Sequence, residues 1–358
     1  MTEVSQIIEA PARQRQGKLL SVINKAEGWF GALGLAWLPH LLKIAIGYNI
    51  KMQLIELRHT LFIPLVGILI FLSAWAILAP KVQTSLGTIP GPVQVWEQAG
   101  NLWDDHVRTR EKATAFYARE DVRNAKLIAE GKEDKVKHRK FTGKATYFDQ
   151  ILTSLVTVLV GFLFASAISI PLGIASGLSK SVSGAISPLI QIFKPVSPLA
   201  WLPIVTMVVS ALYVDTSDWL PKSMVVSAVT VTLCSLWPTL INTTLGVASI
   251  DEGLMNVTKV LRLPIWQTVT KLVLPSSLPF IFTGLRLSLG VGWMVLIAAE
   301  MLAQNPGLGK FVWDEFQNGS SQSLAKIIVA VLTIGIIGFL LDRVMYALQQ
   351  AFTHSSSR

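Results

Sequence analysis

The sequence has few charged residues and a single cysteine, and both shortages narrow its class. Of its 358 residues 15% are charged, whereas soluble proteins average about 25%. The one cysteine, Cys234, lies inside an apolar run, so the sequence predicts neither a disulfide framework nor a cysteine-based metal site. Apolar residues make up 51% of the chain, and its mean hydropathy is +0.52. This balance predicts a protein that crosses a membrane several times.

The common catalytic and nucleotide-binding motifs are also missing. Gly143 and Lys144 do not form a G-x-x-x-x-G-K-[ST] loop, because no glycine stands five residues before Gly143. The sequence contains no H-E-x-x-H zinc motif and no G-x-S-x-G nucleophile motif. Asp104, Asp105 and His106 are interpreted as solvated side chains rather than metal ligands. The sequence therefore predicts a conduit or a receptor, with no catalytic residue, metal site or cofactor of its own.

Six apolar runs are about as long as the roughly 20 residues that a membrane-spanning helix needs. They cover 61–79, 151–178, 185–214, 224–247, 278–303 and 327–352. The predicted fold class is an all-α polytopic membrane protein with six transmembrane helices. Basic residues are frequent before residue 58 and in the loops 179–184 and 248–276, and such loops are usually cytoplasmic. We therefore expect both termini in the cytoplasm.

The remaining segments divide the chain into regions. Residues 1–57 are expected to form a cytoplasmic or interfacial amphipathic region, before a first transmembrane helix at 58–80. Within 28–47 a further span is the alternative reading, although Pro39 and Lys43 interrupt that apolar stretch. Residues 150–352 are expected to form the core with five transmembrane helices and the cytoplasmic loop 248–276, and 353–358 a cytoplasmic tail.

The segment 81–149 is expected to be a periplasmic charged helical insertion. It carries thirteen Lys and Arg residues, but loops longer than about 60 residues escape the rule that places basic loops inside. Apolar residues recur at helical spacing from Val95 to Tyr117, and Gly131 is expected to end the helix. The insertion is either a solvated segment without a role or a docking surface for an external partner. The net charge of +9 favours contact with anionic lipid headgroups over nucleic acid.

Two stretches indicate function. The stretch 195–203, P-V-S-P-L-A-W-L-P, breaks the third apolar run, and non-helical backbone at membrane depth is tolerated only where it lines a cavity or is buried in protein. The stretch 257–279 is basic and amphipathic, and Pro264 is expected to divide it into two short helices. It either lies on lipid or presents a rigid knob to a soluble partner.

Several motifs give the chain a family resemblance. They are P-F-I-F-T-G-L-R at 279–286, A-A-E-M-L at 298–302, G-L-G at 307–309, F-K-P-V-S-P-L-A-W-L-P at 193–203, V-L-T-I-G-I-I-G-F-L-L-D-R at 331–343 and T-S-L-G-T-I-P-G-P at 84–92. With them, the chain resembles the inner-membrane permease subunit of ATP-binding-cassette (ABC) importers. Within that family it is most similar to the nitrate, taurine and bicarbonate group, and in particular to nitrate permeases.

The resemblance implies a type I ABC-importer permease fold in the bacterial inner membrane. It implies a homodimer of permease subunits, since one chain supplies half the usual number of spans. It also implies two ABC ATPase subunits that hold ATP and magnesium, and a periplasmic substrate-binding protein. The cargo implied is nitrate or nitrite, with bicarbonate, cyanate, taurine or another alkylsulfonate as alternatives. A membrane scaffold or sensor without transport and an ion-driven transporter are the competing functions.

In this family the loop before the fifth span docks on the ATPase and carries Glu, Ala and Gly, followed by Leu-Pro. Here Asn256, Thr258 and Arg262 replace the first three, whereas Leu274 and Pro275 match. The ATPase-coupling residues predicted from this loop are Asn256, Thr258, Leu261, Arg262, Pro264, Trp266, Leu274 and Pro275.

The substrate pathway is predicted along the break and the fifth span. Its predicted residues are Lys194, Pro198, Trp201, Arg286, Trp293 and Glu300. Arg286 and Glu300 lie fourteen residues apart, about 21 Å along a helix, so each needs its own partner. Arg286 and Lys194 either anchor the helix ends or contact a passing anion.

Overall fold

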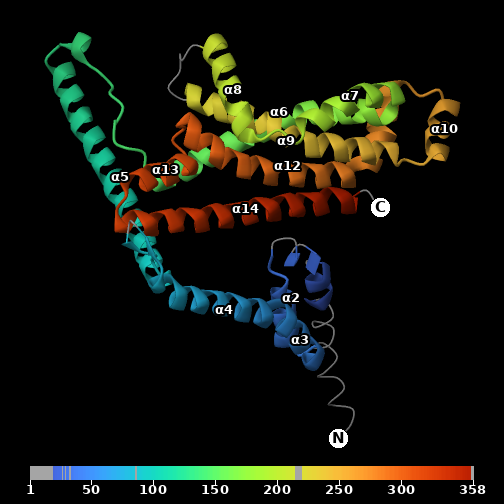
Figure 1. The fold of residues 1–358 in the computed structure, drawn as a ribbon, viewed down its shortest axis with the longest axis horizontal. Coiled ribbons are helices and arrows are strands. Elements are labelled where there is room, and N and C mark those ends of the chain that lie inside the picture. Colours follow the sequence, from blue (N-terminus) through green and yellow to red (C-terminus); the bar gives the residue numbers. More distant parts are fainter. Residues whose placement is uncertain are drawn as a thin grey trace, which may run out of the picture.

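The computed structural model describes residues 19–355 except 26, 29, 32–33, 85–86 and 214–219. Nearly all of these residues are helical (Figure 1). The main helices are α2 Trp37–Ala45, α3 Ile50–Leu57, α4 Ile63–Leu78, α5 Pro92–Ala129, α6 Tyr147–Leu178, α7 Lys180–Phe193, α8 Pro198–Leu212, α9 Lys222–Ala248, α10 Glu252–Val260, α11 Ile265–Thr268, α12 Leu274–Ala303, α13 Leu308–Asn318 and α14 Ser321–Ser355. Two short strands, β1 (Gln83–Thr84) and β2 (Gly87–Thr88), pair in antiparallel fashion.

The membrane-spanning architecture predicted from the apolar runs is confirmed. Five continuous helical stretches in the described chain are long and apolar enough to cross a bilayer. They are Ile50–Lys81, Tyr147–Leu178, Lys222–Ala248, Ile265–Ala303 and Gln322–Phe352. Helices α7 and α8 pass the same test together but are bent by 104° at the junction between them. This bent pair completes a set of six.

The first stretch begins earlier than residue 58, where the sequence placed it. Helix α3 starts at Ile50 and continues through a π-turn, Arg58–Phe62, into α4. The preceding helix α2 has nine residues, about 14 Å in length, which is less than half of the roughly 30 Å hydrocarbon core. Gly47, at φ 78°, follows α2 in a turn, so the described residues from 34 to 47 contain no helix long enough to span the bilayer.

Helix α5 forms a long arm at one end of the molecule (Figure 1). It has 38 residues, which corresponds to about 57 Å. Pro92 occupies its first turn, where no amide hydrogen is needed, and the Gln94 side chain accepts the Gly91 N–H at 3.1 Å. Gly131 follows its end at φ 70°, a left-handed conformation that favours glycine. The helix predicted for this segment is therefore present.

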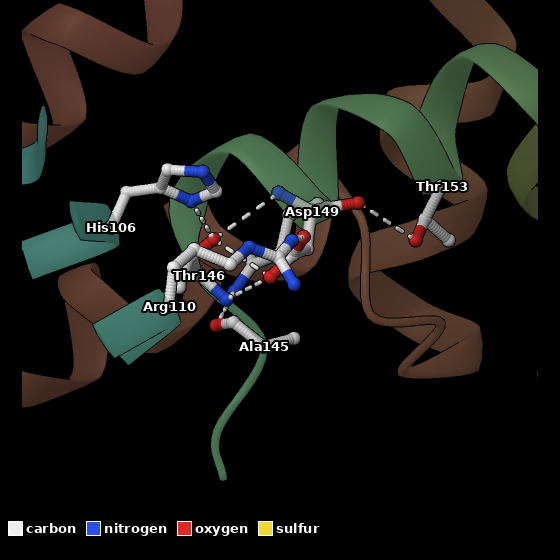
Figure 2. Close-up of polar contacts among 7 residues, drawn as sticks. His106, Arg110, Ala145, Thr146, Asp149 and Thr153 are labelled. Carbon is white, nitrogen blue, oxygen red and sulfur yellow. Dashed lines mark hydrogen bonds and ion pairs between the residues drawn. The ribbon is translucent and has the colours of Figure 1, made fainter. Parts of the chain in front are cut away.

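The base of α5 is fixed to the start of α6 by polar contacts (Figure 2). The Thr146 hydroxyl caps α6 at the Asp149 amide, and the Asp149 carboxylate accepts bonds from the Thr146 backbone N–H at 3.0 Å and hydroxyl at 2.7 Å. Two residues of α5 contact this cap: His106 Nδ1 is hydrogen-bonded to the Thr146 hydroxyl at 2.7 Å, and Arg110 forms an ion pair with Asp149. The N-cap of α6 thus also orients the long arm formed by α5.

The core of the bundle is formed by α6, α9 and α12, which pack closely because small residues face one another. A Cβ atom added at Gly161 of α6 would lie 2.7 Å from both the Ala228 carbonyl oxygen and Val231 Cγ1 of α9. The Thr232 hydroxyl of α9 donates to the Gly161 carbonyl at 3.0 Å. Small residues and interhelical hydroxyl bonds drive helix association where lipid supplies no hydrophobic force.

Gly161→Ala should destabilise the bundle. The new methyl group has no space, and overpacking of this kind costs about 1–3 kcal/mol. We expect the midpoint of thermal unfolding in detergent to fall by several degrees. Gly290→Ala is the matched control, because no heavy atom lies within 4 Å of its added Cβ. Equal midpoints for the two variants would contradict the close approach of α6 and α9.

Candidate functional site

The loop between α9 and α12 folds as a helix, a turn and a second helix. Asp251 caps α10 by accepting the Gly253 N–H at 2.7 Å. After α10 the Leu263 N–H donates a hydrogen bond to the Thr258 carbonyl at 3.0 Å. Pro264 is the N-cap of α11. The division of this stretch at Pro264 therefore occurs as the sequence predicts.

Arg262 adopts φ 48° at the turn. The family resemblance implies a glycine at this position, and few non-glycine residues adopt such a conformation. The bend is thus retained without the glycine, with a left-handed arginine and Pro264 two residues later.

The tip of this loop is an exposed apolar surface. Val260 is 82% exposed, Leu261 62%, Ile265 83% and Trp266 75%. Figure 1 shows α10 at the end of the bundle opposite α5 and α13. We call these four side chains the apolar tip.

The other predicted coupling residues lie away from the apolar tip. Thr258 is buried, with its hydroxyl donating to the Met255 carbonyl at 2.8 Å, so it faces the interior of the loop. Leu274 and Pro275 begin α12 and are half-buried. Asn256 is exposed and accepts a bond from Lys259 at 3.4 Å.

Three aromatic residues, Phe193, Trp201 and Trp237, pack together beside the break between α7 and α8. Lys194 follows the last residue of α7, and Pro198 begins α8 after a Ser197 cap. The Phe193 ring lies 5.6 Å from the Trp201 ring and stacks on Trp237 of α9 at 6.2 Å. Trp237 was not predicted as a site residue, although its position before Pro238 in an apolar run distinguishes it in the sequence.

Arg286 forms an ion pair with Asp342 of α14 rather than with a backbone carbonyl. Its Nη2 donates to Asp342 Oδ2 at 2.7 Å, and its guanidinium carbon lies 5.2 Å from the centre of the Tyr346 ring. A cavity of about 600 Å³ adjoins this pair. The sequence predicted that Arg286 needs a partner of its own, and Asp342 is that partner. Asp342 lies inside the sixth apolar run and was not predicted as a site residue.

Trp293 and Glu300 are buried within the described bundle, and their assignment to the substrate pathway stays a prediction. The Trp293 indole donates to the Ile334 carbonyl at 3.0 Å, and its side chain packs among apolar residues. The Glu300 carboxylate is completely buried. It accepts the Ser154 hydroxyl of α6 at 2.9 Å and the Gly309 N–H of α13 at 2.9 Å. Glu300 therefore joins three helices.

Glu300→Ala should loosen α13 from the bundle. It leaves the Ser154 hydroxyl and the Gly309 amide without their acceptor, and each unsatisfied buried group costs about 1–3 kcal/mol. We expect a lower thermal midpoint and faster protease cleavage near 304–319. Glu97→Ala, on the exposed surface of α5, is the matched control. A thermal midpoint equal to that of the control would refute the role of Glu300 in holding α13 against α6 and α12.

The Arg286 and Asp342 pair should show energetic coupling. Asp342→Asn leaves Arg286 without its carboxylate partner, and Arg286→Gln leaves Asp342 with only the more distant Arg343, at 3.5 Å, whereas the double variant removes both charges of the pair. A double-mutant cycle on thermal stability should give an interaction energy of about 0.5–3 kcal/mol. Additive effects would mean that the two side chains act independently.

Comparison with known proteins identifies the family. Residues 169–354 match the family model described as "Binding-protein-dependent transport system inner membrane component". The chain is 34% identical to a bicarbonate transport system permease, CmpB of Synechococcus elongatus, over 81% of this chain and 88% of that protein. It is 38% identical to a nitrate import permease, NrtB of Synechocystis, over 54% of this chain and 66% of that protein. The chain thus spans just under two thirds of the nitrate permease.

Two further comparisons, one with a protein sequence and one with a solved structure, agree with this family assignment. The taurine transport system permease TauC of Escherichia coli is 32% identical over 58% of this chain and 71% of its own length. A structure of the MetNI methionine ABC transporter in an inward-facing conformation has a TM-score of 0.50 and 14% identity. It covers 57% of this chain and 95% of the matched chain, and it shares the type I ABC-importer permease fold. This chain belongs to the family of multi-pass inner-membrane permeases of binding-protein-dependent transport systems.

Proposed function

We propose that this protein is the transmembrane subunit of an ATP-driven importer for nitrate or nitrite. The 38% identity with the nitrate permease supports this cargo. The exposed apolar tip supports the mechanism, because it offers an ATPase a rigid contact that is continuous with α12. Closure of the ATPases would then move the spanning helix directly.

The proposed assembly contains a second permease copy, two ABC ATPase subunits that bind ATP and magnesium, and a periplasmic substrate-binding protein. None of the residues of α4 is buried within the single chain, so its apolar surface is available to lipid or to the second copy. The apolar tip and α5 lie at opposite ends (Figure 1). This arrangement suits an ATPase in the cytoplasm and a binding protein outside.

Bicarbonate import by the same machinery is the second candidate. The bicarbonate permease aligns with 81% of this chain, a longer match than the 54% of the nitrate permease. Uptake of ¹⁵N-nitrate and ¹³C-bicarbonate by proteoliposomes with the complete importer shows which of the two anions is the cargo. Deletion of 251–275 should abolish uptake of either anion; unchanged uptake would favour a scaffold or sensor instead.

Truncation of the apolar tip should release the ATPase. Large exposed apolar side chains at the centre of an interface dominate its affinity, so Leu261→Ala with Trp266→Ala should weaken ATPase binding at least about tenfold. Co-purification from detergent, followed by mass spectrometry, measures the loss. Trp96→Ala is the matched control, because Trp96 is 80% exposed on α5.

A charge reversal, Arg262→Glu, tests the turn between the two helices in the same assay. If no ATPase accompanies the unaltered chain, the importer proposal fails, and the amphipathic loop is better explained by contact with lipid.

A further inference from the structure

A cavity at the foot of α5 is lined by more cations than carboxylates. It has a volume of about 310 Å³ and is lined by residues of α5, the segment 144–146, α6, α13 and α14. Its lining contains four cationic side chains and two carboxylates, which leaves a net charge of +2. They are Arg108, Lys112, Lys144, Lys326, Asp105 and Glu315. The surplus of positive charge favours an anionic ligand.

Both carboxylates of this cavity already have a cationic partner. Asp105 pairs with Arg108 at 2.8 Å, and Glu315 pairs with Lys326 at 3.3 Å. Among the described residues, neither Lys112 nor Lys144 forms an ion pair. The cavity therefore has two ammonium groups available to a ligand.

A buried amide oxygen in the same lining lacks a hydrogen-bond donor. Gln150 lines the cavity and is 7% exposed, and its Nε2 donates to the Ala145 carbonyl at 3.3 Å. Because a carbonyl only accepts hydrogen bonds, the amide nitrogen must face Ala145 and the oxygen is the atom left over. In the described part of the chain no donor reaches this Oε1. A buried acceptor without a donor requires an explanation, and here it belongs to the wall of a cavity.

We propose that this cavity binds an oxyanion that also carries a hydroxyl group. The ammonium groups of Lys112 and Lys144 attract the anionic oxygens, and the hydroxyl donates to Gln150 Oε1. Bicarbonate has this chemistry, and so does the headgroup of phosphatidylglycerol, whereas nitrate has no hydrogen to donate. The inference goes beyond the proposed import function, because it concerns binding to this chain alone and does not depend on which anion is imported.

The place of the cavity in the fold gives both sources of this chemistry access. Tyr147, in its lining, is the first residue of one candidate span, and Lys326 lies near the start of another, Gln322–Phe352. Anionic lipid headgroups bind basic pockets between such helices. The cavity also lies at the end of the bundle opposite the apolar tip (Figure 1). Its volume far exceeds the roughly 30 Å³ of one water molecule, so it holds a small hydrated anion or a headgroup.

The test measures binding to the purified full-length chain with two probes. Bicarbonate is titrated into the delipidated chain in detergent at constant ionic strength, and phosphatidylglycerol is compared with phosphatidylcholine in nanodiscs by native mass spectrometry. We expect at least one of the two probes to bind. Lys112→Gln with Lys144→Gln should weaken that binding at least about tenfold, because each substitution removes a charged hydrogen-bond donor. Nitrate at equal concentration should compete poorly with either probe.

Lys126→Gln with Lys135→Gln is the matched control, because both lysines are exposed and lie outside the lining. Gln150→Met removes the amide acceptor and should weaken the bound probe without changing competition by nitrate. Because Lys112 and Lys144 are exposed, their double variant tests the site even where the Gln150 variant does not fold.

The probe whose binding depends on the two cavity lysines identifies the source of the oxyanion. The inference is overturned if neither probe binds, or if the cavity variant binds both probes as tightly as the control variant. It is also overturned if nitrate competes as well as the bound probe itself. None of these results decides the imported cargo, which the uptake assay measures separately.

Discussion

The scarcity of hydrogen-bond partners inside a bilayer governs this structure. Lipid tails offer no donor or acceptor, so each backbone group within the span must be satisfied by the chain itself. Helices meet this requirement along five continuous stretches. Helices α7 and α8 are the exception among the candidate spans of the described chain, because they are bent by 104° at the junction between them.

The same constraint explains how the polar side chains of the core are used. Ser154, Glu300 and Gly309 satisfy one another across three helices, which fixes α13 at the end of the bundle that also carries α5. Arg286 and Asp342 do the same between α12 and α14. These groups stabilise the bundle because each has its partner.

The two ends of the bundle have different surfaces, which suits the different partners proposed for them, an ATPase at one end and a binding protein at the other. One end presents a compact apolar tip formed by a turn with a left-handed arginine. The opposite end carries a long, charged arm tied to the cap of α6 by His106 and Arg110 (Figure 2). The helical stretch Ile265–Ala303 runs without a break from the tip into the core, so in the proposed importer a movement at the tip would reach the spanning helices.

The sequence by itself determined the helices, because the apolar runs and the prolines act locally. The spans, the division at Pro264, the break near Pro198 and the arm that ends near Gly131 all follow from residue spacing and backbone chemistry. The start of the first span at Ile50 did not follow, because a π-turn carries the helix across the polar residues Arg58 and His59. Only the tertiary structure decided which side chains meet. It brought Trp201 and Trp237 to Phe193, gave Arg286 its partner in Asp342, and buried Trp293 and Glu300. Contacts between distant segments depend on how helices pack rather than on their individual sequences.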